Sequence, residues 1–390
     1  MARKRLVILG ATGSIGASTL RVVAAHPDRF EVVGLAAGRD AEGLQALAAQ
    51  FQVKHLALAA PNKCGIPSGE AALCALASLE EADLVVMAIA GMAGYAPTLA
   101  AIDAGKDVAL ATKEVLVMAG TEVMRRRQER GVRLLPLDSE HSALFQCLQS
   151  TASEPACVRI GHEAKAEERV AEVILTASGG PFFRRETIDW SRITVAEALN
   201  HPRWEMGPKV TIDSATMMNK GLEMIEALHL FALAPSQLRV WVHPQSIVHS
   251  FVHFKDGALL AQLAQPDMAL PIQYALTWPD RAFHAPVPPM TLAQMQNLEF
   301  SEPDLERFPC LKLVFEALPM GAWTHPILTL ANEVAVKAFL SERITADKIA
   351  AVIEQGLTRA ETDFDAIVRY AEEDVARFER AAPGGARCCS

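Results

Sequence analysis

The segment GATGSIG, residues 10–16, constrains the fold more than any other part of the chain. Its glycines, Gly10, Gly13 and Gly16, are spaced three apart, follow the apolar run RLVIL and precede a helix-like stretch. Glycine lets the backbone turn tightly after a strand and lets an anion approach the N–H groups at the start of the next helix. The pattern is a variant of the dinucleotide fingerprint, so we predict a nucleotide at this loop.

Short apolar runs alternate with helix-like segments through the first third of the chain. The runs are RLVILG, FEVVGLAAG, HLALAA, ADLVVMAIA, DVALAT and VRLLPLD, and the helix-like segments include 17–26, 41–50, 97–104 and 114–130. Buried strands that alternate with helices predict an α/β fold with an N-terminal, Rossmann-like, doubly wound parallel sheet. Ligands of such sheets lie beyond the carboxyl ends of the strands.

The end of the second apolar run bears on which dinucleotide binds. Gly38, Arg39 and Asp40 follow that run. A guanidinium offers paired donors to a ribose 2′-phosphate, whereas a carboxylate accepts a bond from a free 2′-hydroxyl. Arg39 favours NADP(H), although an exposed Arg–Asp pair in a loop needs no ligand.

Charge and hydropathy limit the partners of the chain. A net charge of -9 leaves no general basic surface, which argues against a nucleic-acid partner. The longest uncharged stretch, residues 84–102, is interrupted by Gly91, Gly94 and Pro97, which fits a strand, a loop and a helix rather than a membrane span. The 7 cysteines show no paired metal-ligand spacing, and the basic start of the chain leads into a strand rather than a signal peptide. We therefore expect a cytoplasmic protein.

Acidic residues follow the last of these runs, in LDSEHSALFQCL. Asp138 and Glu140 are two apart, so in an extended segment both carboxylates point to one side and Ser139 turns away. A simpler explanation is that Asp138 or Ser139 caps a helix from about His141, with Glu140 near its positive end. The spacing leaves both explanations open.

A third carboxylate comes from HPRWEMGPKVTIDSATMMNKGLEMIEA, residues 201–227. A helix is expected over about 215–231, and Glu223 lies beside its apolar stripe. A carboxylate at the edge of a buried face needs a partner. Together with Asp138 and Glu140 it would form an all-oxygen ligand set, which suits Mg²⁺ or Mn²⁺ better than Zn²⁺.

Groups that suit a phosphate accompany these acids. Ser178, Gly179 and Gly180 follow the strand-like VAEVILTA, and TIDSATMMNK adds a hydroxyl, an amide and an ammonium. Such donors, with free backbone N–H groups, bind phosphate. Each of them separately fits a turn or a cap, but with the carboxylates they predict a phosphate pocket beside a metal. The residues in the second segment are Ser214, Asn219 and Lys220.

Eight segments together resemble, in order and spacing, the 1-deoxy-D-xylulose 5-phosphate reductoisomerase family. They are GATGSIG, ATKEVLVMAG, LDSEHSALFQCL, TASGGPF, residues 201–227, HPQSIVHSFVHFKDG, AQLAQPDM and ANEVAVKAFL, and they span nearly the whole chain. The resemblance implies conversion of a small phosphorylated sugar, 1-deoxy-D-xylulose 5-phosphate, to 2-C-methyl-D-erythritol 4-phosphate in non-mevalonate isoprenoid biosynthesis. It also implies NADPH, Mg²⁺ or Mn²⁺ with Co²⁺ as a further option, and a homodimer.

The resemblance also implies roles for individual residues. The metal ligands would be Asp138, Glu140 and Glu223. Ser139 and Lys113 would lie near the substrate hydroxyls. The phosphate ligands would be Ser178, His201, Ser214, Asn219 and Lys220. The loop HPRWEMGPK, residues 201–209 and called the lid segment below, would close over the substrate through Trp204, with Met206 near the nicotinamide. Weaker, pocket-lining matches are Ser246, His249, Pro266 and Met268. The nucleotide contacts would be Thr12, Gly13, Ser14, Ile15, Gly38, Arg39, Asp40, Thr112, Glu114 and Gly207.

Two of these positions depart from the family. Asp40 and Thr112 stand where the family commonly has Asn, so the resemblance carries less about the fine contacts to the nucleotide. The metal ligands show no departure.

Composition divides the rest of the chain. The segment TWPDRAFHAPVPPMTL is rich in proline and is typical of a linker, and residues 304–377 have helical patterns. We predict an NADPH-binding domain over 1–138, a central α+β catalytic, metal-binding and dimerisation domain over 139–275, a linker over 276–303 and a helical domain over 304–390. His325 and Asn332 are expected to pack or cap.

Two other functions remain open from the sequence. An NADP-dependent semialdehyde dehydrogenase shares the GATG-type loop but requires a thiolate near a His. Cys147 in ALFQCLQS and Cys157 in EPACVRI do not resemble a nucleophile turn. An NADP-sensing binding protein without chemistry would leave the three carboxylates and Lys220 with little reason to coexist.

Overall fold

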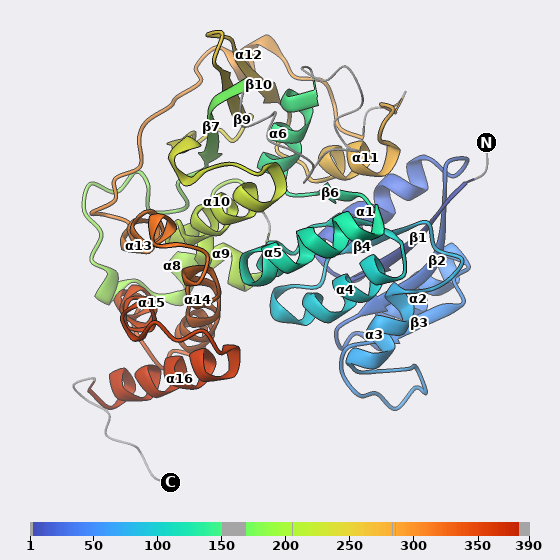
Figure 1. The fold of residues 1–390 in the computed structure, drawn as a ribbon, viewed down its shortest axis with the longest axis horizontal. Helices are drawn as coiled ribbons and strands as arrows, with labels where there is room; N and C mark the ends of the chain where they lie inside the picture. Colours follow the sequence, from blue (N-terminus) through green and yellow to red (C-terminus); the bar gives the residue numbers. More distant parts are fainter. Residues whose placement is uncertain (1–2, 150–168, 205, 283, 285, 382–390) are drawn as a thin grey trace. The chain divides into compact units, whose positions relative to one another are not determined.

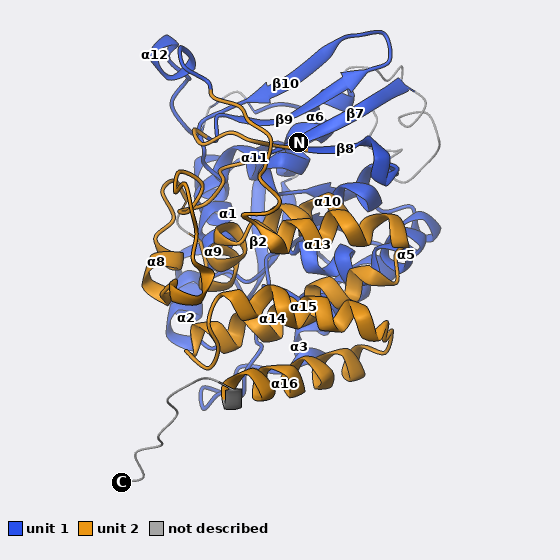
Figure 2. Ribbon diagram, turned by 90° about the vertical axis from the view of Figure 1, so that its left-hand side faces the viewer, with its two compact units in different colours: residues 1–176, 226–239, 246–298 blue, residues 177–225, 240–245, 299–390 orange. Residues whose placement is uncertain are grey.

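The computed structural model describes residues 3–149, 169–204, 206–282, 284 and 286–381. Cys157, considered above as a nucleophile, lies outside the described residues. The chain divides into two compact units, each assembled from separate stretches (Figure 2). Unit 1 comprises residues 1–176, 226–239 and 246–298, and unit 2 comprises residues 177–225, 240–245 and 299–390. The domain boundaries expected from composition stay a prediction.

Unit 1 contains a six-stranded parallel sheet in the order β3-β2-β1-β4-β5-β6 (Figure 1). The order reverses between β1 and β4, which is the switch point where such sheets bind ligands. The predicted Rossmann-like sheet is confirmed. Its strands are β1 Lys4–Leu9, β2 Phe30–Ala37, β3 His55–Leu58, β4 Leu84–Met87, β5 Asp107–Leu110 and β6 Leu134–Pro136.

Helices cover both faces of this sheet, which is why its central strands are apolar throughout. Helices α3, α4 and α5 lie side by side on one face (Figure 1). The crossovers through α1 and α2 run in the opposite direction along the sheet, which places these two helices on the other face. The helices are α1 Ser14–Ala25, α2 Ala41–Phe51, α3 Glu70–Ala77, α4 Tyr95–Asp103 and α5 Lys113–Arg130. The helices expected from the sequence therefore end within three residues of the observed ones.

A second sheet has the order β10-β9-β7-β8 and lies mainly in unit 1. Strand β9 pairs antiparallel with both β7 and β10, and α6 packs against β9 and β10. The elements are α6 Ser139–Gln149, β7 Val170–Ala177, β8 Leu238–Val242, β9 Val248–Phe254, β10 Leu259–Leu263, α11 Ala269–Thr277 and α12 Leu292–Met295.

Unit 2 is mostly helical, and its C-terminal part confirms the predicted helical region. Helix α14 is its core, since 13 of its residues are buried and it packs on α15 and α16. Its helices are α8 Val195–Leu199, α9 Pro208–Ala215, α13 Pro309–Ala317, α14 Thr324–Leu340, α15 Asp347–Arg359 and α16 Phe364–Ala381. Helix α10, Met218–Phe231, begins in unit 2 and ends in unit 1. No helix in the described part of the chain is long and apolar enough to cross a membrane.

The single helix expected over 215–231 is wrong at its beginning. Met217 has a φ of +58 and lies between α9 and α10. It ends the helical conformation there, because a left-handed residue cannot continue a right-handed helix. Helix α9 itself was not expected. Its signal was Pro208 at the first helical position after Gly207, a place that proline favours.

Candidate active site

The glycine loop turns from β1 into α1 within unit 1. The N–H groups of Gly10 and Ala11 both donate to Ala36 O, at 2.9 and 2.7 Å. A Cβ on Gly16 would lie 2.3 Å from Gly10 O, so only glycine lets the helix start this close to the strand. No side chain caps α1 at Gly13, which leaves its first N–H groups available to an anion.

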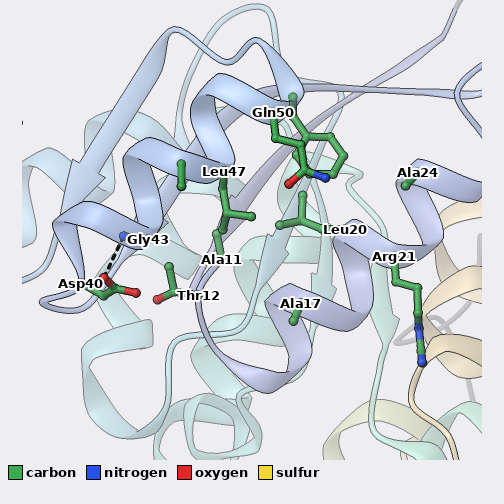
Figure 3. A pocket seen from close by; sticks show the side chains of 12 residues that line it. Ala11, Thr12, Ala17, Leu20, Arg21, Ala24, Asp40, Gly43, Leu47 and Gln50 are labelled. Atoms are coloured by element: carbon green, nitrogen blue, oxygen red, sulfur yellow. Dashed lines mark hydrogen bonds between the residues drawn. The ribbon is translucent and has the colours of Figure 1, made fainter.

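A cavity of about 580 Å³ opens beside this loop, between α1 and α2 (Figure 3). Thr12 and Asp40 line one end of it, and Leu20 and Leu47 line its apolar wall. Asp40 also caps α2, because its Oδ1 accepts from Gly43 N at 2.8 Å. Asp40 therefore has a structural role in capping α2, and the neighbouring Arg39 is exposed.

The remaining nucleotide residues are spread over both units. Thr112, which is buried, donates to Ile89 O, and Glu114 is buried in the first turn of α5. Gly207 lies in unit 2 as the residue before α9. Their contact with a nucleotide stays a prediction.

Asp138 sits at the junction of β6 and α6 and begins the helix. Its carbonyl accepts from Ser142 N at 2.8 Å and its Oδ1 from Ser139 N at 3.0 Å. Of the two explanations that the spacing left open, the extended Asp138–Glu140 pair is wrong, and the helix begins at Ser139 rather than at about His141. Ser139 is the first helical residue, and its Oγ donates to Glu140 Oε2 at 2.5 Å. The Asp138 carboxylate thus accepts the first N–H of the helix.

The two carboxylates nevertheless come close together. One oxygen of Asp138 and one of Glu140 lie within 4.8 Å of each other, and Ser250 Oγ on β9 donates to Glu140 O at 3.0 Å. Lys113 Nζ forms an ion pair with Asp138 Oδ2, and their side chains are 9% and 16% exposed. Two neighbouring oxygen donors with a nearby ammonium fit a hard divalent cation and an oxygen-rich substrate.

Two buried residues that the sequence reading missed adjoin this pair. His141 Nδ1 lies 3.9 Å from Asp138 Oδ2 and 3.4 Å from Glu226 Oε2, and neither His141 nor Glu226 has an exposed side chain. The available signal was the spacing of Glu223 and Glu226 on α10, which puts both on one helix face. His141 thus lies as a buried ring between Asp138 and Glu226.

The phosphate candidates Ser178 and Ser214 meet in unit 2 through backbone packing. Gly180, two residues after Ser178, has a φ of +66, and a Cβ there would lie 2.6 Å from Ser214 O. Gly180 N donates to Ser178 Oγ at 3.2 Å. The loop after β7 is thereby fixed against the end of α9, as the glycine pair in TASGGPF requires.

His201 links this loop to the lid segment. Its Nε2 lies 3.0 Å from Ser178 Oγ, while its Nδ1 accepts from Arg203 N at 3.2 Å and Trp204 N at 2.9 Å. Because Nδ1 is an acceptor, the proton of the neutral ring is on Nε2 and is donated to Ser178. Burial lowers the pKa of His201 to about 4, which keeps the ring neutral at pH 7. Trp204 itself is partly buried.

The predicted ligands on α10 contact one another. The Asn219 amide donates to Glu223 Oε1, and the Lys220 ammonium pairs with Glu223 Oε2. Lys220 and Glu223 are 4% and 1% exposed. The carboxylate that the sequence placed at the edge of a buried face therefore has two partners from its own helix, the buried Lys220 and the partly buried Asn219.

A further buried carboxylate, Asp213 on α9, was not singled out from the sequence. Its Oδ1 accepts from Asn332 Nδ2 on α14 at 2.8 Å, and Lys209 Nζ lies 2.7 Å from its Oδ2. Asn332 thus bonds to α9, which agrees with a structural role. The contact ties the end of the lid segment and the neighbouring Ser214 to the helical core of unit 2.

The two buried cysteines of the described residues, Cys147 and Cys310, do not support thiol chemistry. Burial raises the pKa of Cys147 to about 11 and that of Cys310 to about 12, so both thiols stay protonated at neutral pH. This disfavours the dehydrogenase alternative for the residues concerned.

Family models and relatives agree on what this chain resembles. Three models match in succession: 1-deoxy-D-xylulose 5-phosphate reductoisomerase over residues 6–120, the C-terminal domain of that enzyme over 134–231, and the DXP reductoisomerase C-terminal domain over 263–379. The chain is 48% identical over 362 residues to the reductoisomerase of Moorella thermoacetica, covering 90% of each chain. It is 45% identical over 392 residues to that of a Janthinobacterium species, covering 96% of this chain and 97% of the relative.

Solved structures give the same result. A crystal structure of DOX-P reductoisomerase in complex with NADPH, fosmidomycin and magnesium has a TM-score of 0.86 and 39% identity, and covers 97% of each chain. The reductoisomerase of Zymomonas mobilis in complex with NADPH has a TM-score of 0.83 and 36% identity, covering 98% of this chain and 100% of that one. The resemblance in the sequence is therefore confirmed, and the chain belongs to the 1-deoxy-D-xylulose 5-phosphate reductoisomerase family.

Proposed function

We propose that the chain is an NADPH- and divalent-metal-dependent reductoisomerase. It converts 1-deoxy-D-xylulose 5-phosphate to 2-C-methyl-D-erythritol 4-phosphate, by a rearrangement followed by hydride reduction, in non-mevalonate isoprenoid biosynthesis. The observation that carries the proposal is the 48% identity to a reductoisomerase over 90% of both chains. The cofactors follow from relatives whose structures contain NADPH and magnesium.

Asp138, Glu140 and Glu223 are the proposed metal ligands. Asp138 and Glu140 already hold their oxygens within 4.8 Å. Glu223 lies one helical turn before Glu226 on the continuous helix α10, and Glu226 contacts His141 beside Asp138. When bound, Mg²⁺ or Mn²⁺ polarises the substrate carbonyl and stabilises oxyanion charge. An all-oxygen set fits either ion, and Co²⁺ is a further option.

The other groups in the site bind and orient. Lys113 and Ser139 donate to the substrate hydroxyls, and each already contacts a neighbouring carboxylate. The phosphate is proposed to lie against Ser178, where the hydroxyl accepts from both His201 and Gly180 N and so directs its own hydrogen outward. The remaining phosphate donors are Ser214, Asn219 and Lys220.

The lid segment is proposed to exclude water once the phosphate is bound. Trp204 supplies apolar cover for the methyl end of the substrate, and Met206 lies toward the nicotinamide. Binding energy from the remote phosphate favours such a closure without acting at the reacting carbons. Neutral His201 links phosphate binding to closure of the lid segment, because its ring contacts both Ser178 and the backbone of Trp204.

NADPH is proposed to bind along the carboxyl edge of the parallel sheet. Its pyrophosphate lies at Thr12, Gly13, Ser14 and Ile15, where α1 has uncapped N–H groups. Arg39 pairs with the 2′-phosphate beside Gly38 and Asp40. Thr112, Glu114 and Gly207 complete the proposed nucleotide contacts.

We further propose a cytoplasmic homodimer. Strand β10 is an edge of the second sheet as the described residues form it, and Leu259 and Leu260 on it are 49% and 37% exposed. An exposed apolar edge strand is a template for pairing with another chain. Sedimentation at micromolar concentration tests this, and a monomer there contradicts it.

One assay tests the proposed activity. Purified protein should oxidise NADPH in the presence of 1-deoxy-D-xylulose 5-phosphate only when a divalent cation is present. Failure with every divalent metal would reject the assignment. The binding-protein alternative predicts NADPH binding without turnover, and the dehydrogenase alternative predicts loss of activity on thiol alkylation.

A further inference from the structure

Two donors on α10 occupy both oxygens of the Glu223 carboxylate. Asn219 binds Oε1 and Lys220 binds Oε2, from positions four and three residues earlier on the helix. Because Lys220 and Glu223 are 4% and 1% exposed, bulk water scarcely competes for the pair. Asn219 and Lys220, the proposed phosphate ligands, are thus bound to Glu223, a proposed metal ligand.

We propose that Lys220 and Asn219 couple metal binding to phosphate binding. Glu223 holds both donors until a divalent cation takes its oxygens, and the released donors then turn to the phosphate of the ligand. This rests on the proposed function, because it needs Glu223 as a metal ligand and Lys220 as a phosphate ligand. It adds a linkage between the two binding events.

Electrostatic repulsion explains why metal binding should strengthen phosphate binding. A divalent cation and an ammonium repel when they share one carboxylate, and the repulsion is strong where water is excluded. Lys220 can respond because a lysine carries a point charge on a flexible four-carbon stem, so the ammonium moves without moving the helix. A cation at Glu223 weakens the hold of that carboxylate on the buried ammonium, and a phosphate at the proposed site offers the ammonium an anion.

The reverse effect follows from thermodynamic linkage. A phosphate that draws Lys220 away from Glu223 removes a competing cation from the carboxylate and strengthens metal binding. The two enhancement factors must be equal, since coupling between two ligands is reciprocal. The metal and the phosphate therefore load the site cooperatively.

Unit 1 contains a second pair of the same kind. Lys113 Nζ binds Asp138 Oδ2, in side chains 9% and 16% exposed, and Asp138 is another proposed metal ligand. A cation at Asp138 would release Lys113 toward the substrate hydroxyls by the same repulsion. Each of the two proposed substrate-binding lysines is thus held by a proposed metal ligand.

Binding of Mn²⁺ and inorganic phosphate to the full chain, without turnover, tests the coupling. Free Mn²⁺ is counted by electron paramagnetic resonance, and phosphate binding is measured by calorimetry. We expect saturating Mn²⁺ to strengthen phosphate binding about tenfold, and phosphate to strengthen Mn²⁺ binding by the same factor. An unchanged phosphate affinity, or no binding of Mn²⁺, would overturn the proposal.

The variant Glu223→Gln separates the linkage from simple loss of the metal. The amide cannot hold the ammonium by charge, so metal-free Glu223→Gln should bind phosphate several-fold more tightly than the parent chain. Glu122→Gln is the control, because it removes the same charge from an exposed salt bridge on α5, and it should bind phosphate as the parent does. Equal metal-free affinities in Glu223→Gln and the parent would contradict the linkage.

Direct attraction between Mn²⁺ and phosphate is the remaining explanation, and Lys220→Met distinguishes it. Attraction alone leaves the enhancement by Mn²⁺ intact in Lys220→Met, whereas the proposed linkage predicts a several-fold smaller enhancement. Turnover of 1-deoxy-D-xylulose 5-phosphate is scored separately. An active parent enzyme without coupling would reject this inference and leave the proposed function standing.

Discussion

His201 Nδ1 accepts the backbone N–H of Trp204 at 2.9 Å, so the ring that contacts Ser178 also contacts the backbone of the lid segment. The contact fixes the tautomer of His201 and ties the position of Trp204 to Ser178. A ligand at Ser178 can therefore affect the lid through one side chain.

Substitutions that keep one ring nitrogen at a time should separate these two functions. His201→Asn keeps an acceptor near Nδ1 for the lid, and His201→Gln keeps a donor near Nε2 for Ser178. Each lost hydrogen bond is worth about 1 kcal/mol. We expect His201→Asn to raise KM about fivefold with little change in kcat, and His201→Gln to lower kcat by a similar factor. Steady-state NADPH oxidation measures both, and identical profiles for the two variants would contradict separate roles.

Gly180→Ala should damage both folding and phosphate binding. An added Cβ would lie 2.6 Å from Ser214 O at a φ of +66. Left-handed backbone costs an alanine about 1 to 2 kcal/mol, and the clash adds about 1 to 3 kcal/mol. We expect KM to rise at least about tenfold on this basis.

Gly131→Ala is the matched control for that substitution. Gly131 has the same φ of +66, but nothing lies within 4 Å of its Cβ position. It should lower the free energy of unfolding by about 1 kcal/mol and leave KM unchanged. Equal effects of the two substitutions, measured by denaturation and kinetics, would show that the contact with Ser214 does not matter.

Stability should fall between pH 6.5 and 4. Burial lowers the pKa of both His201 and His229 from 6.5 to about 4, so the folded state keeps these rings neutral while the unfolded state binds protons below pH 6.5. The stabilisation is complete above pH 6.5 and is lost as the pH falls toward 4. Denaturant midpoints across this range test the prediction. His201→Asn should flatten the curve, and an unaltered slope in that variant would remove His201 from it.

Removal of the metal should abolish turnover. Excess chelator is expected to stop NADPH oxidation and added Mg²⁺ to restore it, because the polarised carbonyl is lost and regained. Glu223→Gln should lower kcat/KM by roughly a hundredfold or more. Glu122→Gln, on an exposed salt bridge of α5, controls for the loss of one charge. Full turnover in chelator would reject a metal role.

Arg39→Ala should weaken the preference for NADPH. An ionic hydrogen bond to the 2′-phosphate is worth about 1.5 to 3 kcal/mol. Its loss should therefore raise KM for NADPH roughly tenfold to a hundredfold. NADH lacks the phosphate and provides the internal control, since its KM should not change. A parallel rise for both nucleotides would place Arg39 elsewhere in the site.

Local patterns in the sequence determined the parallel sheet, the glycine loop and the helical C-terminal region. Hydrophobic periodicity and glycine spacing are properties of a few neighbouring residues. They predict local structure because short-range steric effects decide which backbone conformations those residues adopt. The residues proposed to bind the metal and the phosphate were also named from local sequence, by the types of their donor groups and the spacing between them. Their individual roles were implied by the family resemblance.

Tertiary structure decided how those residues are held. Glu140 lies in helix α6, which begins at Ser139, and the helix expected over 215–231 divides at Met217. Asn332 reaches Asp213 across 119 positions of sequence, and His201 reaches back 23 positions to Ser178. A buried carboxylate or imidazole must find its partner wherever packing brings one. Residue types and spacings therefore named the groups proposed for the chemistry, and only the packed chain fixed which residues contact each of them.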